Sequence, residues 1–243
     1  MPGPDLCAID IDFRSLGPVE RLGLLSRRVS GRFVFTTSLG LEDQVLLHLI
    51  VESGIAVDVV TLDTGRLFPE TYDLWARTET RYGLRIRAFY PDATALETMV
   101  REQGINGFYA SKSARSACCG VRKSEPLDRA LDRAAVWITG LRADQSAARN
   151  DMPFVAYDLA HDLLKANPLL DWTREQTVTF ARAQDIPVNA RHDRGFVSIG
   201  CAPCTRAIEP GETERAGRWW WEEDETRECG LHLVDGRLVR AGA

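Results

Sequence analysis

Short β-branched and aromatic segments alternate with longer helix-like segments over much of the chain. This alternation predicts strands at residues 32–37, 56–63, 84–90 and 134–140, and helices at 41–53, 68–82, 94–103 and 121–133. Strand–helix–strand repeats form right-handed crossovers and so place neighbouring strands parallel in one sheet. The sequence therefore predicts an α/β fold with a mostly parallel sheet flanked by helices.

The second half of the chain departs from this alternation. Residues 154–160 and 162–170 are expected to form a further β pair, and residues 173–185 a helix with Thr173 as its N-cap. From about Gly195 the pattern becomes irregular. We expect a single domain over residues 1–243, with a core at about 31–210 and a C-terminal tail at about 211–243 that covers the site.

Length and charge exclude several classes of protein. The chain has 243 residues, enough for one large α/β domain, and a formal net charge of −5. No apolar run approaches the roughly 20 residues that span a bilayer. The opening "MPGPDLCAIDIDFRSLG" lacks the basic and apolar regions of a secretory signal. We therefore expect a cytoplasmic protein that binds neither nucleic acid nor membranes.

Four of the six cysteines form two tight pairs, Cys118 with Cys119 and Cys201 with Cys204. In a reducing compartment such pairs indicate a metal or catalysis more often than disulfides. Zinc ligands are usually separated by two to four residues, whereas adjacent residues point about 100° apart on a helix. Each iron of a cubane can take its own thiolate. The pattern therefore favours a 4Fe-4S cluster over zinc, a vicinal disulfide or buried thiols.

Basic residues follow both cysteine pairs. Arg122 and Lys123 come one turn after Cys119, and Arg206 comes soon after Cys204. A cluster with four thiolates is negatively charged, so cations near it are expected. We predict that Lys123 couples electrostatically to both the cluster and the substrate; the alternative is a solvated helix face.

The loops after the strands are the expected ligand sites, because ligands of such sheets bind at the carboxyl ends of the strands. These loops are "SLGLED" (38–43), "DTGRLFPE" (63–70) and "GLRADQS" (140–146). The first opens a helix whose backbone N–H groups can bind an anion. It lacks the second glycine and the serine of pyrophosphate-binding loops, which favours a phosphate carrying a sulfate. Residues 63–66 would position a ribose or adenine, unless they only cap a helix.

Arginines and tryptophans gather in the last part of the chain. Arg215 and Arg218, together with Arg142 after the fourth strand, suit bidentate contact with phosphate or sulfate oxygens. Residues 219–221 are three consecutive tryptophans, which we interpret as packing anchors for the tail rather than as a stacking platform.

The motif "ECGLH" (228–232) contains the candidate nucleophile, Cys229. A thiol has an ordinary pKa near 8.5, and the neighbouring Glu228 disfavours the thiolate. The compensating charge would come from Arg215, Arg218 or a protonated His232. A nucleophile on a tail can fold in to react and swing out to meet a second protein. The remaining cysteine and histidines are expected to be incidental (Cys7), structural or surface residues (His48, His161), or to hold a loop near the site (His192).

With these motifs in this order, the chain resembles the assimilatory adenylyl-sulfate (APS) reductases of the phosphoadenylyl-sulfate (PAPS) reductase family. The resemblance runs from about residue 32 to residue 232, and its most specific parts are the CC…CxxC set and ECGLH. It implies a Rossmann-like adenine nucleotide α-hydrolase (PP-loop-like) fold. Leu39 stands where many relatives have an aromatic residue, a change that removes no polar contact.

The resemblance also implies a reaction. Cys229 would attack the sulfur of APS, AMP would leave, and thioredoxin or a glutaredoxin-like dithiol protein would release sulfite from the S-sulfocysteine, for cysteine biosynthesis. Cys118, Cys119, Cys201 and Cys204 would hold the cluster. The residues implied around the nucleotide and its sulfo-phosphate are Ser38, Gly40, Asp43, Lys123, Arg142, Arg215, Arg218 and His232, to which the second loop adds Asp63, Thr64, Gly65 and Arg66.

Three other functions compete with this one. A PAPS reductase, or an enzyme that uses both substrates, would share the fold, but the cluster cysteines favour APS. An ATP pyrophosphatase of the same fold is disfavoured by the first loop and by ECGLH. An RNA-binding Fe–S or zinc module is disfavoured by the net charge of −5. The sequence leaves the oligomeric state open, a homo-oligomer included.

Overall fold

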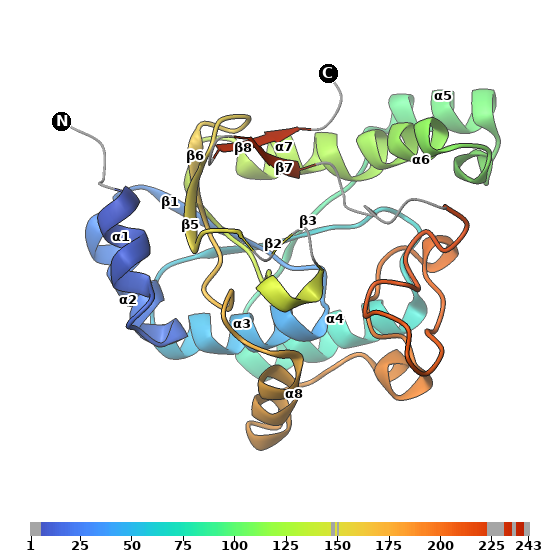
Figure 1. Cartoon of the computed structure of the whole chain (residues 1–243). Coiled ribbons are helices and arrows are strands. Elements are labelled where there is room, and N and C mark those ends of the chain that lie inside the picture. Colours follow the sequence, from blue (N-terminus) through green and yellow to red (C-terminus); the bar gives the residue numbers. More distant parts are fainter. Residues whose placement is uncertain (1–5, 147–148, 150, 223–230, 235–236, 241–243) are drawn as a thin grey trace.

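The computed structural model describes residues 6–146, 149, 151–222, 231–234 and 237–240, and it describes side chains for 7–222 within these ranges (Figure 1). The helices are α1 (Leu6–Phe13), α2 (Pro18–Arg28), α3 (Leu41–Ser53), α4 (Pro69–Tyr82), α5 (Ala93–Gln103), α6 (Lys112–Cys119), α7 (Glu125–Leu131) and α8 (Arg174–Ala183). The strands are β1 (Arg32–Thr36), β2 (Asp58–Leu62), β3 (Arg87–Phe89), β4 (Ala134–Ile138), β5 (Val155–Asp158), β6 (Leu163–Ala166), β7 (Leu231–Val234) and β8 (Arg237–Arg240).

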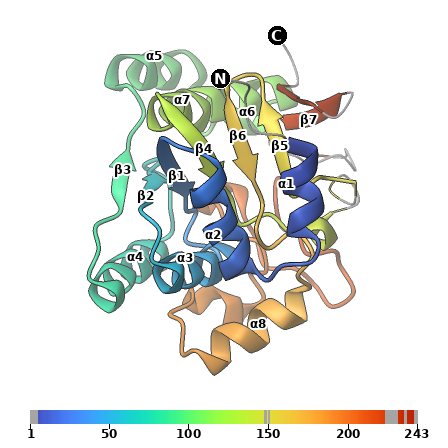
Figure 2. The same cartoon turned by 90° about the vertical axis from the view of Figure 1, so that its left-hand side faces the viewer.

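The strands form one sheet in the order β3-β2-β1-β4-β6-β5-β8-β7. The first five strands in this order, from β3 to β6, run parallel to one another. Strand β5 runs antiparallel to β6, and β7 runs antiparallel to β8. Helices α3 and α4 lie on one side of the sheet and α5, α6 and α7 on the other (Figures 1 and 2). The predicted α/β architecture with a mostly parallel sheet is confirmed.

Strand β1 shows how the sequence builds this layered arrangement. Side chains of a strand point alternately to the two faces of a sheet, and Phe33 and Phe35 of β1 pack in the larger hydrophobic core. Val34 between them packs in the second core, with Val60 and Trp137. A central strand buried on both faces reads as a continuous apolar run, and this is the pattern that predicted it.

Several segments differ from the expectation. Helices α1, α2 and α6 were not predicted. The helical segment expected at residues 121–133 is confirmed as far as Leu131, but its first turn is π-helical (η2, Gly120–Ser124) and only α7 is a regular α-helix. The C-terminal segment, expected to be irregular, forms the β7–β8 hairpin, and Leu238 of β8 pairs with Asp158 of β5.

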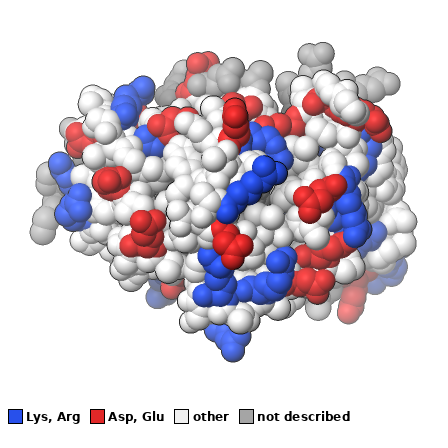
Figure 3. Space-filling view, turned by 90° about the horizontal axis from the view of Figure 1, so that it is seen from below, with Lys and Arg blue, Asp and Glu red and all other residues white. Residues whose placement is uncertain are grey.

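No described helix is long and apolar enough to cross a membrane. Seen from below, the molecule presents Lys and Arg side chains interspersed with Asp and Glu (Figure 3). That face therefore lacks the broad single-sign stripe that binds a nucleic-acid backbone.

Candidate functional site

The loop between β1 and α3 is closed by its own carboxylate. Asp43 accepts hydrogen bonds from the backbone N–H and the hydroxyl of Ser38, at 2.6 and 2.7 Å. Burial raises the pKa of Asp43 to about 6, although the Ser38 hydrogen bonds oppose this rise. Leu39 lies in the left-handed region with φ 59°, and Gly40 is the N-cap of α3. A loop tied to its own first helical turn is preorganised rather than adaptable.

Gly140, directly after Thr139 at the end of β4, brings a second loop against the first. A Cβ atom at this position would lie 2.3 Å from the Asp43 carboxylate, so only glycine fits. The Gly140 backbone N–H also donates to Asp43. The loops after β1 and β4 therefore meet at Asp43, as the carboxyl ends of adjacent parallel strands should.

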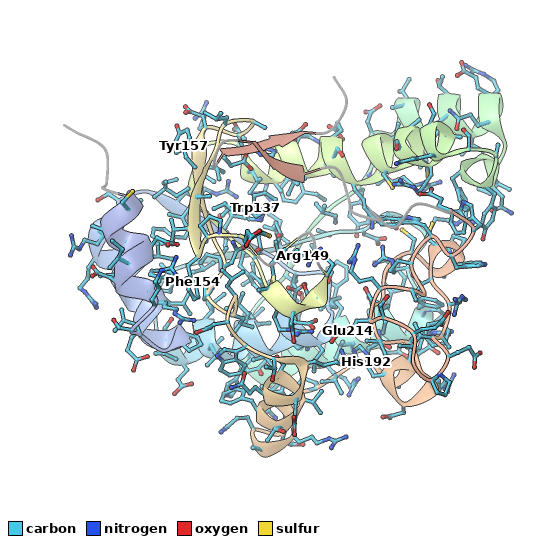
Figure 4. All side chains as sticks on the ribbon, in the orientation of Figure 1. Trp137, Arg149, Phe154, Tyr157, His192 and Glu214 are labelled. Carbon is cyan, nitrogen blue, oxygen red and sulfur yellow. The ribbon has the colours of Figure 1, made fainter. Side chains whose placement is uncertain are left out.

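Arg142 is fully buried, with a side-chain exposure of 0%. Its guanidinium donates to Glu42 at 2.8 and 3.0 Å, to Glu214 at 2.8 Å, and to Asp144. Burial opposes the charge, but Glu42, Glu214 and Asp144 raise the pKa of Arg142. Figure 4 shows Glu214 below the short helix η3 (Ala143–Gln145). Arg142, predicted to contact substrate, thus holds three carboxylates together.

The loop after β2 is closed by Asp63, and no described side chain caps α4, whose N-cap residue is Phe68. Asp63 accepts hydrogen bonds from the Gly65 N–H and from the Tyr72 hydroxyl, both at 2.8 Å. Burial and this contact raise the pKa of Tyr72 to about 12. Arg66 donates to the carbonyl of Ile105 and to Asn106, both at 2.8 Å. The side chains of this loop are therefore committed to structure.

This same loop is bound to the second cysteine pair. The Thr64 hydroxyl lies 3.3 Å from Cys201 Sγ, and the carbonyl of Arg66 accepts from the Ala202 N–H at 2.7 Å. Arg122, in the π-helical turn, donates to the Thr64 carbonyl at 2.5 Å. The loop expected to bind ribose or adenine thus forms one side of the cysteine region, a contact that spacing alone did not predict.

The two cysteine pairs, about 80 residues apart in sequence, line one cavity. Cys118 and Cys119 end α6 and are half-buried. Cys201 directly precedes the turn η6 (Ala202–Cys204), Cys204 ends it, and both are buried. The rest of the lining is cationic or aromatic: Phe108, Arg115, Arg122, Lys123, Arg218 and Trp219. The described part of the chain contains no group of three or more His, Cys, Asp or Glu side chains placed to hold a metal ion.

The pKa values of the thiols in the cavity shift in different directions. Burial opposes ionisation of Cys201, but Lys123, the Thr64 hydrogen bond and Arg218 together lower the pKa of this thiol. Burial and the charge of Cys201 raise the pKa of Cys204 to about 11. Burial also raises the pKa of Cys118, against the effect of Arg122. The predicted coupling of Lys123 to the cysteines is consistent with this geometry.

Arg218 lines the cysteine cavity. It is 8% exposed, and a Cβ atom at residue 200 would lie 2.4 Å from its guanidinium, so Gly200 leaves it room. Its Nε has no hydrogen-bond partner among the described residues. Its guanidinium carbon is 5.0 Å from the ring of Trp219, and that of Arg215 is 5.9 Å from the same ring.

The tryptophans are packing anchors, as predicted. Trp219 is 1% exposed, and its backbone N–H donates to the Cys204 carbonyl at 3.2 Å. Trp221 packs edge-on against Tyr109 with ring centroids 4.5 Å apart. Only Trp220 is substantially exposed, at 37%. These side chains fix the segment before the tail to the cysteine region.

Sequence reasoning missed the buried ion pair between Arg115 and Glu222. The two side chains are 6% and 7% exposed, with Nε–Oε1 and Nη2–Oε2 distances of 2.5 and 3.1 Å. Arg115 lies three residues before Cys118, just as Arg122 lies three residues after Cys119. Because Arg122 was already expected to lie near the cluster, the same spacing could have pointed to Arg115.

The candidate nucleophile Cys229 and its neighbour Glu228 lie outside the described residues. His232 belongs to β7, and only its backbone pairing with Val239 is described. The three described histidines behave as expected. His48 packs edge-on against Tyr82 and Phe180, His161 binds Asp158 and Asp128, and His192 bonds the carbonyl of Phe196, which holds its loop.

Comparison with known proteins identifies relatives over most of the chain. Residues 32–207 match the phosphoadenosine phosphosulfate reductase domain family. An adenosine 5'-phosphosulfate reductase of Agrobacterium fabrum is 52% identical over 95% of this chain and 88% of its own. One of Allochromatium vinosum is 47% identical over 94% and 89%.

Solved structures show the same fold at lower identity. The PAPS reductase of Candida auris, in a phosphate complex, superposes with a TM-score of 0.71 at 24% identity, over 84% of this chain and 96% of its own. An FMN adenylyltransferase of Candida glabrata, in complex with ATP, gives 0.53 at 16% identity, over 94% and 83%. The predicted PP-loop-like α/β fold is therefore confirmed.

Proposed function

The chain belongs to the phosphoadenosine phosphosulfate reductase family, and on that premise we propose that it reduces adenosine 5'-phosphosulfate (APS) to sulfite and AMP in sulfate assimilation. Relatives at about half sequence identity over nearly the whole chain are APS reductases. The observation that carries the proposal is the convergence of both cysteine pairs and four cations on one cavity beside the loop after β2.

The reaction proceeds in two steps on Cys229. Its thiolate attacks the sulfur of APS, the bond from sulfur to the bridging phosphate oxygen breaks, and AMP leaves with the electron pair. A thiolate of a dithiol protein such as thioredoxin or glutaredoxin then attacks the Cys229 sulfur, and sulfite leaves. The second thiol of that protein closes a disulfide on the reductant and returns Cys229 as a thiol, so the dithiol supplies both electrons.

Substrate binding is proposed for the loops at the carboxyl edge of the sheet. The helix N-terminus at Gly40 and the Ser38 hydroxyl offer donors to phosphate oxygens. Arg142 reaches the substrate only by exchanging one of its carboxylates for a ligand oxygen, and Glu214 is the partner furthest along the chain. Lys123, Arg215, Arg218 and His232 are proposed to act on the sulfo-phosphate, and Asp43, Asp63, Thr64, Gly65 and Arg66 to shape the pocket.

A 4Fe-4S cluster fits the cysteine cavity better than a single ion does. A lone tetrahedral ion needs its donors to converge on one point, whereas a cubane spreads its irons and takes one thiolate for each. Four cations line the same cavity and suit a negatively charged cluster. When bound, the cluster would cross-link α6 to the turn at residues 201–204. The proposed ligands are Cys118, Cys119, Cys201 and Cys204.

A reducing compartment suits this chemistry. The five described cysteines are all free thiols, and the proposed reductant is a dithiol protein, so we place the enzyme in the cytoplasm. We propose no nucleic-acid or membrane partner. Turnover measured with APS and PAPS side by side tests the substrate, and a strong preference for PAPS would reject APS as the substrate.

Intact-protein mass spectrometry tests the function directly. Anaerobic, cluster-loaded protein mixed with sulfur-labelled APS in the absence of reductant should gain one sulfonate on Cys229 and lose it when a dithiol is added. The Cys229→Ser variant should gain none, and Cys7→Ser, which changes an exposed thiol that does not line the cavity, should behave like the parent. A cluster-loaded parent that forms no adduct would exclude the proposed mechanism.

A further inference from the structure

One buried ion pair joins the helix that carries the first cysteine pair to the start of the C-terminal tail. Arg115 lies in α6, three residues before Cys118, and Glu222 lies seven residues before Cys229. Their side chains meet through two hydrogen bonds, of 2.5 and 3.1 Å, with 6% and 7% exposure. Two parallel bonds between a guanidinium and a carboxylate fix direction as well as distance.

The surroundings of this pair connect it to the cysteines on both sides. The Arg115 guanidinium carbon lies 4.5 Å from the centroid of the Trp219 ring, and the backbone N–H of Trp219 donates to the Cys204 carbonyl at 3.2 Å. The Glu222 N–H donates to the Trp219 carbonyl at 2.9 Å. Burial opposes the charge of Arg115, but Glu222 and a hydrogen bond with Cys119 raise its pKa. Arg115 thus lines the cysteine cavity, and Glu222 binds behind it.

A contact of this kind contributes orientation more than stability. Removing two charges from water offsets most of their attraction, so a buried ion pair can often be replaced by apolar side chains with little loss of stability. The same replacement loses the directional bonds. By contrast, the pair of Arg129 and Glu125 in α7 is about half exposed, and such pairs contribute little to orientation or to stability.

We propose that Arg115 and Glu222 are positioning residues that hold the start of the tail against the cysteine cavity and so set the distance from which Cys229 reaches the substrate. This inference rests on the proposed function. It assigns to the cysteine region a mechanical role: the helix that bears Cys118 and Cys119 also bears the anchor of the nucleophile's segment.

The rate of sulfonate formation in a single turnover at saturating APS tests the proposal. Glu222→Gln keeps the shape of the side chain and removes its charge, and we expect the rate to fall about 10- to 100-fold, because a small misplacement of a reacting group has effects of this size. The affinity for AMP and the cluster absorbance should stay at the parent values. Glu125→Gln, the matched exposed carboxylate, should leave all three unchanged.

The double variant Arg115→Met/Glu222→Met separates positioning from stability. It should unfold near the parent temperature and still react slowly. A parent-like rate in this variant, or in Glu222→Gln, would overturn the proposal, as would a slow rate explained by lost cluster or lost AMP affinity.

Backbone hydrogen exchange tests the pair even if the reaction scheme fails. In cluster-loaded protein without nucleotide, Glu222→Gln should speed exchange at residues 219–222, and Glu125→Gln should not. Unchanged exchange would reject the anchor by itself. A parent that forms no adduct but shows the exchange difference would reject the proposed function and keep the anchor.

Discussion

The cysteine cavity and the network around Arg142 handle buried charge in opposite ways. In the network one cation meets three carboxylates, those of Glu42, Asp144 and Glu214. In the cavity four cations gather among the described lining residues, which include no carboxylate, and Glu222 binds behind Arg115. Since buried charges are normally paired, ionised thiols in the proposed cluster would supply anions to the cations of this cavity.

In the Arg142 network the partners of the buried cation are protein carboxylates, whereas in the cavity the proposed partner of the cations is a bound cluster. The Arg142 network is complete among the described residues and holds the loops after β1 and β4 together with the C-terminal segment. The cavity holds thiols with unlike pKa values, Cys201 lowered and Cys204 raised. All four sulfurs would be ionised together in the proposed cluster, because thiols bind iron as thiolates.

Replacing a cavity thiol should have the largest effect. In Cys201→Ser the buried sulfur nearest Thr64 is lost, so we expect nearly all of the cluster absorbance and turnover to disappear after anaerobic reconstitution. Iron and sulfide analysis with visible absorption measures the loss. Cys7→Ser supplies the control, because that thiol is exposed and does not line the cavity. A Cys201→Ser protein that retains a full cluster would remove Cys201 from the ligand set.

Breaking the Arg142 network should have the second-largest effect. Arg142→Met leaves three carboxylates without their buried cation, and we expect the free energy of unfolding to fall by about 3–5 kcal/mol. Urea unfolding measures it, with Arg85→Met as the control, since that side chain is 90% exposed and should change stability by about 0.5 kcal/mol or less. A loss as small as the control's would mean that the network is not coupled to folding.

The regular parts of this fold were predictable because local chemistry and tertiary packing agree there. The helix expected at residues 41–53 is α3 to the residue, and the predicted cap at Thr173 forms a capping box with Gln176. Central strands such as β1 are apolar on both faces, and the alternation of strands and helices forces the parallel sheet. Helix caps, helix-terminating residues and hydrophobic periodicity each specify these elements within a few residues of sequence.

The sequence predicted several residues that line the cysteine cavity but not the contacts between them. Pair spacing identified the four cysteines, but no pattern within "LDTGR" predicts that Thr64 contacts Cys201, more than 130 residues away. Charge type predicted cations near the cysteines, yet it could not tell that Arg218 lies at the cavity while Arg142 is held by three carboxylates. Such assignments depend on which loops meet, and only the fold decides that.

The pH dependence of stability tests the loop side of the comparison. Asp43 has a folded pKa of about 6 against an ordinary 3.8, so the folded state prefers the protonated form. Its contribution to stability is therefore fully present below about pH 4 and is lost as pH rises through about 6. The difference should be about 2 kcal/mol, since partial exposure screens part of the shift. Urea unfolding between pH 4 and 7 should show this slope, and Asp43→Asn should flatten it. An unchanged slope in the variant would assign the effect to another group.

The smallest expected effect concerns the loop that joins the two regions. Tyr72→Phe removes one of the two donors to Asp63, whose carboxylate keeps the Gly65 N–H, and so should lower the free energy of unfolding by about 1 kcal/mol. The Thr64 contact with Cys201 does not involve Tyr72, so cluster content should not change. If Tyr72→Phe instead reduced cluster content as Cys201→Ser does, the loop after β2 would be part of the cavity's own support, and the division drawn between the two regions would fail at this loop.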